Sequence, residues 1–172
     1  HCTYLNPEGT RFSDGTYGTC FLSERLGAAL SESIRLRENF LKSTAQGAIR
    51  LDMRVLKTTV CGAFDDATKL PAVKNDVAHK QFWHERQREG CDGAYFHLDG
   101  RPNCRCVEAF RPRFLTKATQ ERPLTYTWDG QTIIQVYDFQ EGKNVYLDLL
   151  RSEGELFHVD NPLSVGRISA QP

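Results

Sequence analysis

Apolar residues recur at helical spacing between residues 24 and 41. The apolar positions are Leu26, Ala29, Leu30 and Ile34. Their spacing of three and four residues predicts a helix over residues 24–41, with Ser23 as its N-cap. At about 100° per residue, Glu32 lies just outside the apolar stripe. We therefore expect its carboxylate to be half buried, at the edge of the core.

Shorter patterns on either side predict the remaining N-terminal elements. The β-prone run 17–22 predicts a first strand, and the strict alternation of apolar and charged residues over 49–55 predicts a half-buried one. A second helix is expected over 76–89, ended by Gly90. The residues that it is expected to bury are Ala78, Phe82 and Trp83.

The remainder of the chain favours strands joined by tight turns. The expected strands cover 93–96, 104–110, 124–128, 132–139 and 145–150. Asp129-Gly130 supplies a hairpin turn within this series. The pattern as a whole predicts an α+β fold with two main helices. We divide the chain into a core over 1–115 and a C-terminal β-meander over 116–172 that continues the same domain.

The composition excludes some classes of partner. Lysine plus arginine and aspartate plus glutamate both number 22, so the formal net charge is zero and gives no long-range attraction to nucleic acid. No apolar stretch approaches the roughly 20 residues that span a bilayer, so we expect no membrane partner. The chain does not begin with methionine and shows no signal peptide, which indicates a fragment or a processed form.

The six cysteines allow three interpretations. Several of them lie in apolar strand-like runs, which favours reduced thiols and a cytoplasmic site of action. A secreted, disulfide-bonded interaction domain without enzymatic activity is the alternative. The set Cys91, His97, Cys104 and Cys106 has the residue types of a zinc site. No CxxC pair is present, however, so we expect no metal site.

Two stretches of the chain resemble the RES domain family. The first covers 11–32, where an Arg-Phe turn leads to a strand with Phe21 near its end and to a helix with Glu32 eleven positions later. The second, over 89–110, is similar to the family's Gly-x-Asp-Gly-Ile-x-Tyr and its closing apolar strand. Members carry a tyrosine where this chain has Phe21 and a serine near the position of His97. The family includes toxins of bacterial toxin–antitoxin pairs that are related to ADP-ribosyltransferases.

The resemblance implies mixed sheets like those of ADP-ribosyltransferases and an NAD-consuming enzyme. Breaking the nicotinamide–ribose bond develops an oxocarbenium ion, which a fixed carboxylate stabilises. Glu32 takes that catalytic role. Arg11 suits the pyrophosphate, and Phe21 or Tyr17 suits a stack on nicotinamide. NAD is then a substrate, and no recycled cofactor is expected.

Three further positions are assigned to NAD by the same resemblance. His1 and Thr3 are similar to the His-x-Thr of the diphtheria-toxin branch, and His97 replaces the family's serine as a polar group. Glu108 could be a second active-site carboxylate or an outward-facing strand residue.

The expected function is that of an NAD-consuming toxin or effector domain. It acts as an NAD glycohydrolase or phosphorylase, or as an ADP-ribosyltransferase that modifies a protein or RNA. We expect a neutralising antitoxin or immunity protein as partner, and action in the cytoplasm, with delivery as a secreted effector as one route.

Overall fold

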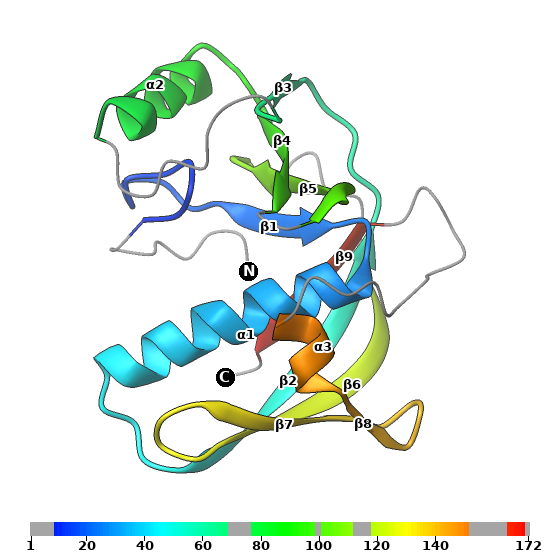
Figure 1. Ribbon diagram of the computed structural model, residues 1–172. Coiled ribbons are helices and arrows are strands. Elements are labelled where there is room, and N and C mark those ends of the chain that lie inside the picture. The colour runs from blue at the N-terminus through cyan, green and yellow to red at the C-terminus, as the bar shows by residue number, and fades with distance from the viewer. Residues whose placement is uncertain (1–8, 69–76, 99–100, 112–117, 152–164, 171–172) are drawn as a thin grey trace. The chain divides into compact units, whose positions relative to one another are not determined.

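The computed structural model describes residues 9–68, 77–98, 101–111, 118–151 and 165–170, and it divides into two compact units. Unit 1 is built from His1–Ser23 and Thr59–Lys117, and unit 2 from Glu24–Thr58 and Ala118–Pro172. Each unit therefore combines two segments that are separated in the sequence (Figure 1).

Unit 1 contains a mixed sheet and one described helix. The elements are β1 (Cys20–Ser23), β3 (Phe64–Asp66), α2 (Val77–Arg88), β4 (Gly93–Leu98) and β5 (Arg101–Ala109). The strand order is β3-β4-β5-β1, in which β3 runs parallel to β4 and the other pairs are antiparallel. Gly90 follows α2 with a φ of +104°, the left-handed conformation that glycine adopts without strain after a helix.

Aromatic side chains form the core of unit 1. Phe12 lies at the centre, with its ring centroid 5.0 Å from both Trp83 and Phe96 in edge-on geometry. The ring centroid of Phe110 lies 6.0 Å from that of Trp83, also in edge-on geometry. The prediction for α2 was correct for Trp83, which is buried, and wrong for Ala78 and Phe82, which are exposed. Because α2 is polar around most of its circumference, it buries a single tryptophan rather than a wide stripe.

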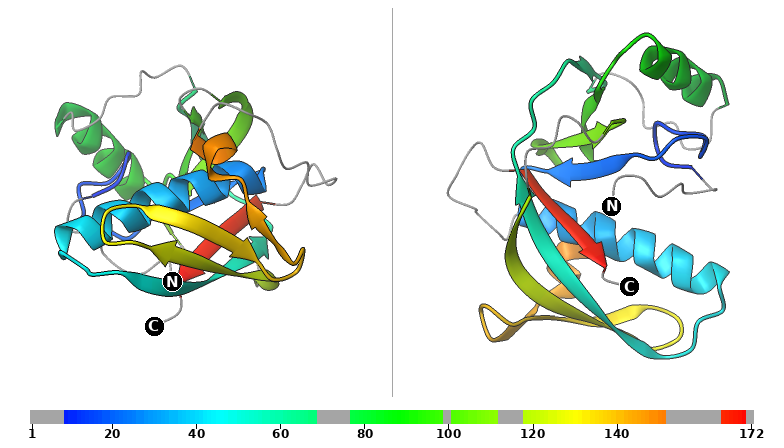
Figure 2. Two further views of the ribbon diagram at one scale, coloured as in Figure 1. Left: turned by 60° about the horizontal axis from the view of Figure 1, so that its bottom comes forward. Right: turned by 180° about the vertical axis from the view of Figure 1, so that it is seen from behind.

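Unit 2 contains an antiparallel sheet covered by a long helix. Its elements are α1 (Leu26–Ser43), β2 (Ile49–Thr58), β6 (Thr119–Trp128), β7 (Ile133–Asp138), β8 (Lys143–Val145), α3 (Leu147–Arg151) and β9 (Val165–Ala170). The strand order is β9-β2-β6-β7-β8. Helix α1 crosses one face of this curved sheet (Figures 1 and 2). The predicted stripe is buried there against the core residues Met53, Val55, Leu124, Tyr126, Trp128 and Val136.

Three hydrogen bonds fasten the β6–β7 hairpin to α1 and to the turn after it. One carboxylate oxygen of Glu38 accepts hydrogen bonds from the Thr132 hydroxyl (2.6 Å) and from the Ile133 amide (2.8 Å). The Trp128 indole donates to the Gln46 carbonyl at 2.9 Å. The hairpin is thus fixed by directional bonds as well as by apolar packing, which gives α1 a defined position on the sheet.

The α+β class with two main helices and a C-terminal meander is confirmed. Two local predictions were wrong. Ser23 does not cap α1, because it is buried in β1 against Cys104 and the N-cap is Arg25. The stretch 145–150 is not a strand, because β8 ends at Val145 and α3 follows. The division at residue 115 stays a prediction.

Candidate functional site

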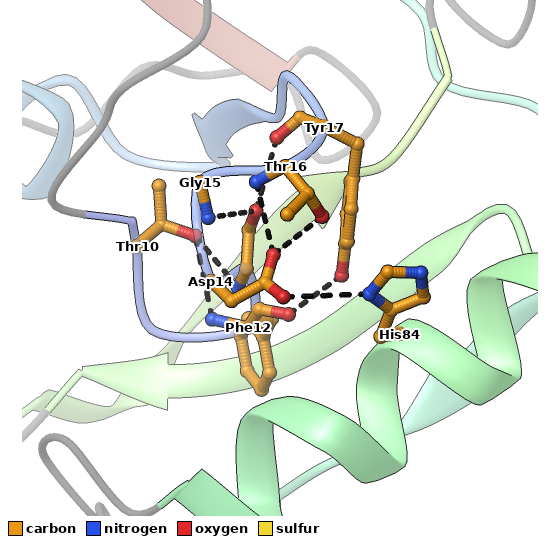
Figure 3. Close-up of polar contacts among 8 residues, drawn as sticks. Thr10, Phe12, Asp14, Gly15, Thr16, Tyr17 and His84 are labelled. Atoms are coloured by element: carbon orange, nitrogen blue, oxygen red, sulfur yellow. Dashed lines mark hydrogen bonds and ion pairs between the residues drawn. The ribbon is translucent and has the colours of Figure 1, made fainter.

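The first candidate segment is the loop over residues 9–17 in unit 1, named here the 9–17 loop (Figure 3). The Thr10 amide donates to the Ser13 carbonyl (2.8 Å), and the Thr10 hydroxyl accepts from the Ser13 amide (3.1 Å). Gly9 precedes this turn with a φ of +73°, and a Cβ there would collide with the Ser13 carbonyl oxygen. The sequence therefore closes a tight turn in which Arg11 and Phe12 are the two central residues.

Tyr17 fastens the end of the loop to its beginning. Its hydroxyl donates to the Phe12 carbonyl at 2.7 Å, while the Ser13 hydroxyl donates to the Tyr17 carbonyl at 3.0 Å. Burial raises the pKa of the Tyr17 phenol, and the negative charge of Glu108 raises it further. Tyr17 therefore stays neutral and acts as a hydrogen-bond donor within the loop.

An exposed acidic turn joins the loop to α2. One carboxylate oxygen of Asp14 accepts from the amide (2.9 Å) and hydroxyl (2.6 Å) of Thr16, and these bonds hold the pKa of Asp14 below its usual range. The other oxygen lies 3.4 Å from Nδ1 of His84. Because the Asp14 and His84 side chains are both more than a third exposed, solvent screens the ion pair and it contributes little to stability.

Arg11 and Phe21 are brought together around one aromatic ring. The guanidinium carbon of Arg11 lies 5.1 Å from the ring centroid of Phe96, within the range of a cation–π contact. The Phe21 ring centroid is 6.2 Å from the same ring. Phe96 on β4 is buried and therefore provides a fixed platform for both side chains. No pattern in the sequence indicates this role for Phe96.

Glu108 stands on the same face of the sheet as Phe21. The two residues are directly opposite each other in the antiparallel pairing of β1 and β5, so their side chains project to one side. Glu108 is almost fully buried, and its Oε1 accepts a short hydrogen bond from the Thr10 hydroxyl. This places a buried carboxylate under the 9–17 loop rather than on an outer face of the strand.

Glu32 lies on α1 in unit 2 and is largely shielded from solvent. Its side chain is 16% exposed, as expected for a position beside the buried stripe. Both carboxylate oxygens accept from the Arg35 guanidinium, at 2.8 and 2.5 Å. The bidentate contact holds the carboxylate in one orientation and keeps its charge partly neutralised.

The other predicted residues lie apart from this group or outside the described residues. His97 follows Phe96 on β4, so strand alternation directs its side chain to the opposite face, where Nδ1 lies 3.1 Å from the Cys104 carbonyl oxygen. The structure therefore does not bring His97 together with Arg11 and Phe21. His1 and Thr3 lie outside the described residues.

A known protein family matches most of the chain. The model of the RES domain matches residues 2–129, about three quarters of the chain. The chain belongs to the RES domain family. Membership supports an NAD-related, toxin-like domain. The matched range includes Arg11, Phe21 and Glu32, and it ends one residue after β6.

A relative of this RES domain is "Uncharacterized protein y4oC" of Sinorhizobium fredii, which is 36% identical over 143 residues. The alignment covers 82% of this chain and 61% of the relative, so the chain spans less than two thirds of the relative's length. No solved structure matches the chain.

The described cysteines of the RES domain form no disulfide with one another. Four of them are buried and Cys61 is exposed. No cluster of three or more histidine, cysteine or acidic side chains suited to a metal ion occurs within the described ranges. Among those ranges, too, no helix has the length and apolar character needed to cross a membrane.

Proposed function

We propose that this RES domain cleaves the nicotinamide–ribose bond of NAD, with Glu32 as the catalytic carboxylate. The observation that carries the proposal is the family match, which covers both motifs, together with Glu32 as a shielded carboxylate on a well-packed helix. A group of this kind is preorganised, because its position does not depend on the substrate.

Glu32 supplies the negative charge that the reaction needs. As the carbon–nitrogen bond to nicotinamide breaks, positive charge develops on the ribose ring, and a nearby carboxylate stabilises it. Both oxygens of that carboxylate accept hydrogen bonds from Arg35. The ribose hydroxyls therefore compete with Arg35, whose side chain is 55% exposed, for the same carboxylate oxygens.

Arg11 and Phe21 supply the binding groups. The Arg11 guanidinium matches a pyrophosphate through paired N–H donors, and the Phe21 ring offers a face to the nicotinamide. Both side chains are half-buried and rest on Phe96, so little conformational entropy is lost when they bind. Tyr17 acts by holding the loop, since its hydroxyl is already bonded to Phe12.

The acceptor of the ADP-ribosyl unit is water or phosphate, which makes the domain an NAD glycohydrolase or phosphorylase. Transfer to a protein or RNA is the alternative outcome of the same bond cleavage. Continuous loss of NAD is harmful to the cell that contains the enzyme. We therefore also propose a neutralising protein partner, and action in the cytoplasm, where NAD is abundant.

The test follows the products of NAD. The purified chain is incubated with NAD labelled in its adenylate part, with and without inorganic phosphate, and released nicotinamide is quantified by chromatography. Hydrolysis gives free ADP-ribose, phosphorolysis gives ADP-ribose 1-phosphate only when phosphate is present, and transfer leaves the label on a macromolecule. If no nicotinamide is released above the rate without protein, the proposal is wrong.

A further inference from the structure

From the contacts beneath the 9–17 loop, we propose that Glu108 and Thr10 form a clamp that positions Arg11 for the pyrophosphate of NAD. The inference rests on the proposed function, because it assigns a task to Arg11. It adds Thr10, which neither the family resemblance nor the sequence pattern assigns to the site, and it gives Glu108 a positioning role.

The clamp begins with a buried charge. Glu108 on β5 is 4% exposed and is paired across both neighbouring strands, with Phe21 on one side and Ala94 on the other. Its backbone position is therefore fixed from two directions. A carboxylate held in such a place requires hydrogen-bond donors, because burial without them is costly. One of these donors is the Thr10 hydroxyl.

Thr10 links the loop to the fixed carboxylate of Glu108 by hydrogen bonds. Its hydroxyl donates to Glu108 and at the same time accepts from the amides of Ser13 (3.1 Å) and Phe12 (3.4 Å). The two amides belong to the peptide groups on either side of Phe12, and the first of these peptides directly follows Arg11. One oxygen atom therefore ties the backbone next to Arg11 to the middle of the sheet.

The clamp holds the Arg11 side chain in position. Arg11 follows Thr10 directly, and its guanidinium lies over Phe96, which stands on the same sheet face as Ala94 and Glu108. Without the clamp, the turn retains its Thr10–Ser13 backbone bond but loses the hydrogen bond from Thr10 to Glu108 on β5. The guanidinium then samples positions away from the ring, and the affinity for an anionic group falls.

A catalytic role for Glu108 is the competing interpretation. Its Oε1 is engaged by Thr10 and its side chain is buried, so the carboxylate faces the loop rather than an open surface. We therefore assign it as a positioning residue. The two roles differ in what a glutamine does, since Glu108→Gln keeps an oxygen that accepts from Thr10 but cannot act as a base.

The experiment uses matched threonine variants of the whole chain. Thr10→Val removes the hydroxyl and keeps the shape, whereas Thr10→Ser keeps the hydroxyl. Thr125→Val is the control, because it deletes a hydroxyl-to-carboxylate bond of the same type, to Asp52, on the exposed sheet of unit 2. Nicotinamide release gives kcat and KM, and NAD binding is measured separately by calorimetry in the Glu32→Gln background.

The expected result is a roughly tenfold rise in KM and in Kd for Thr10→Val, equivalent to about 1.4 kcal/mol, with kcat changed by less than about threefold. Thr10→Ser and Thr125→Val should remain within about threefold of the parent protein. Glu108→Gln should raise KM a few-fold and retain kcat. Weakened NAD binding in Thr10→Val alone supports the clamp even where no nicotinamide is released, which separates its outcome from that of the proposed function.

Three results overturn the inference. NAD binding to Thr10→Val equal to that of the parent protein, or no NAD binding at all, removes the positioning role. A fall in melting temperature without any change in KM or Kd assigns the bond to stability alone. A kcat loss of about a hundredfold in Glu108→Gln, with Thr10→Val unaffected, assigns Glu108 to the chemistry instead.

Discussion

Glu32→Gln is the variant that tests the proposed chemistry most directly. It removes one negative charge and leaves the size of the side chain almost unchanged. Loss of a preorganised electrostatic group lowers kcat by about 10²–10³, or roughly 3–4 kcal/mol of transition-state stabilisation. The folded state loses much less. The Arg35 partner is 55% exposed and three residues along the same helix, so the pair contributes about 0.3–0.5 kcal/mol.

These two magnitudes make the assay decisive. For a chain of this size, about 0.5 kcal/mol shifts the melting temperature by only about 1–2 °C. Glu38→Gln on the same helix is the matched control, because Glu38 accepts two hydrogen bonds from the β6–β7 hairpin. Glutamine keeps one accepting oxygen but loses the negative charge, which costs about 1–2 kcal/mol over the two bonds. The melting temperature therefore falls by about 2–8 °C, while kcat of the folded protein is retained.

Nicotinamide release and thermal unfolding are measured on both variants. Each variant is expected to lose a different property: Glu32→Gln loses activity, and Glu38→Gln loses stability. A Glu32→Gln protein with kcat within about threefold of the parent refutes the catalytic assignment. Equal loss of melting temperature in the two variants shows instead that Glu32 has a structural role.

Three further outcomes are expected. Gly9→Ala should lower the melting temperature by about 2–4 °C or more, because the positive φ and the collision with the loop backbone together cost at least about 1 kcal/mol. An unchanged melting temperature would contradict this geometry. Hydrogen bonding from Arg86 lowers the pKa of Asp65. The stability that this bond contributes is present above the unfolded pKa of about 4 and is lost as the pH falls through the lower folded value. An NMR titration should show a higher Asp65 pKa in Arg86→Gln. Cys61 is exposed, whereas burial raises the pKa of the Cys91 thiol, so alkylation at pH 8 followed by peptide mapping should modify Cys61 much faster.

Periodicity predicted the elements whose stability depends on one apolar face. The stripe of α1 and the alternation in β2 each have a single way to be buried, so pattern and structure agree. The ends of the elements were less predictable. Ser23 has the residue type of a helix cap, yet its small side chain also fits against Cys104 in the sheet of unit 1, and packing decided between the two.

Some residues of the candidate site could be predicted from the sequence, and others could not. Arg11, Phe21 and Glu32 could be selected because their spacing resembles a known family, and each then proved to be half-buried. Phe96 and Thr10 could not be selected, because their roles depend on contacts between distant segments. The bond from Thr10 to Glu108 joins residues 98 positions apart, and no local pattern records such a pairing.

The pairing of β9 with β2 determines when unit 2 can be completed during synthesis. Strand β2 lies between β6 and β9, and its register with β9 runs from Met53 with Ala170 to Thr58 with Val165. A ribosome therefore releases β2 more than a hundred residues before its second neighbour exists. Translation that stops early leaves one edge of β2 open and yields no finished sheet around α1. Completion of the sheet in unit 2 therefore waits for the segment that contains β9, far along the chain from β2.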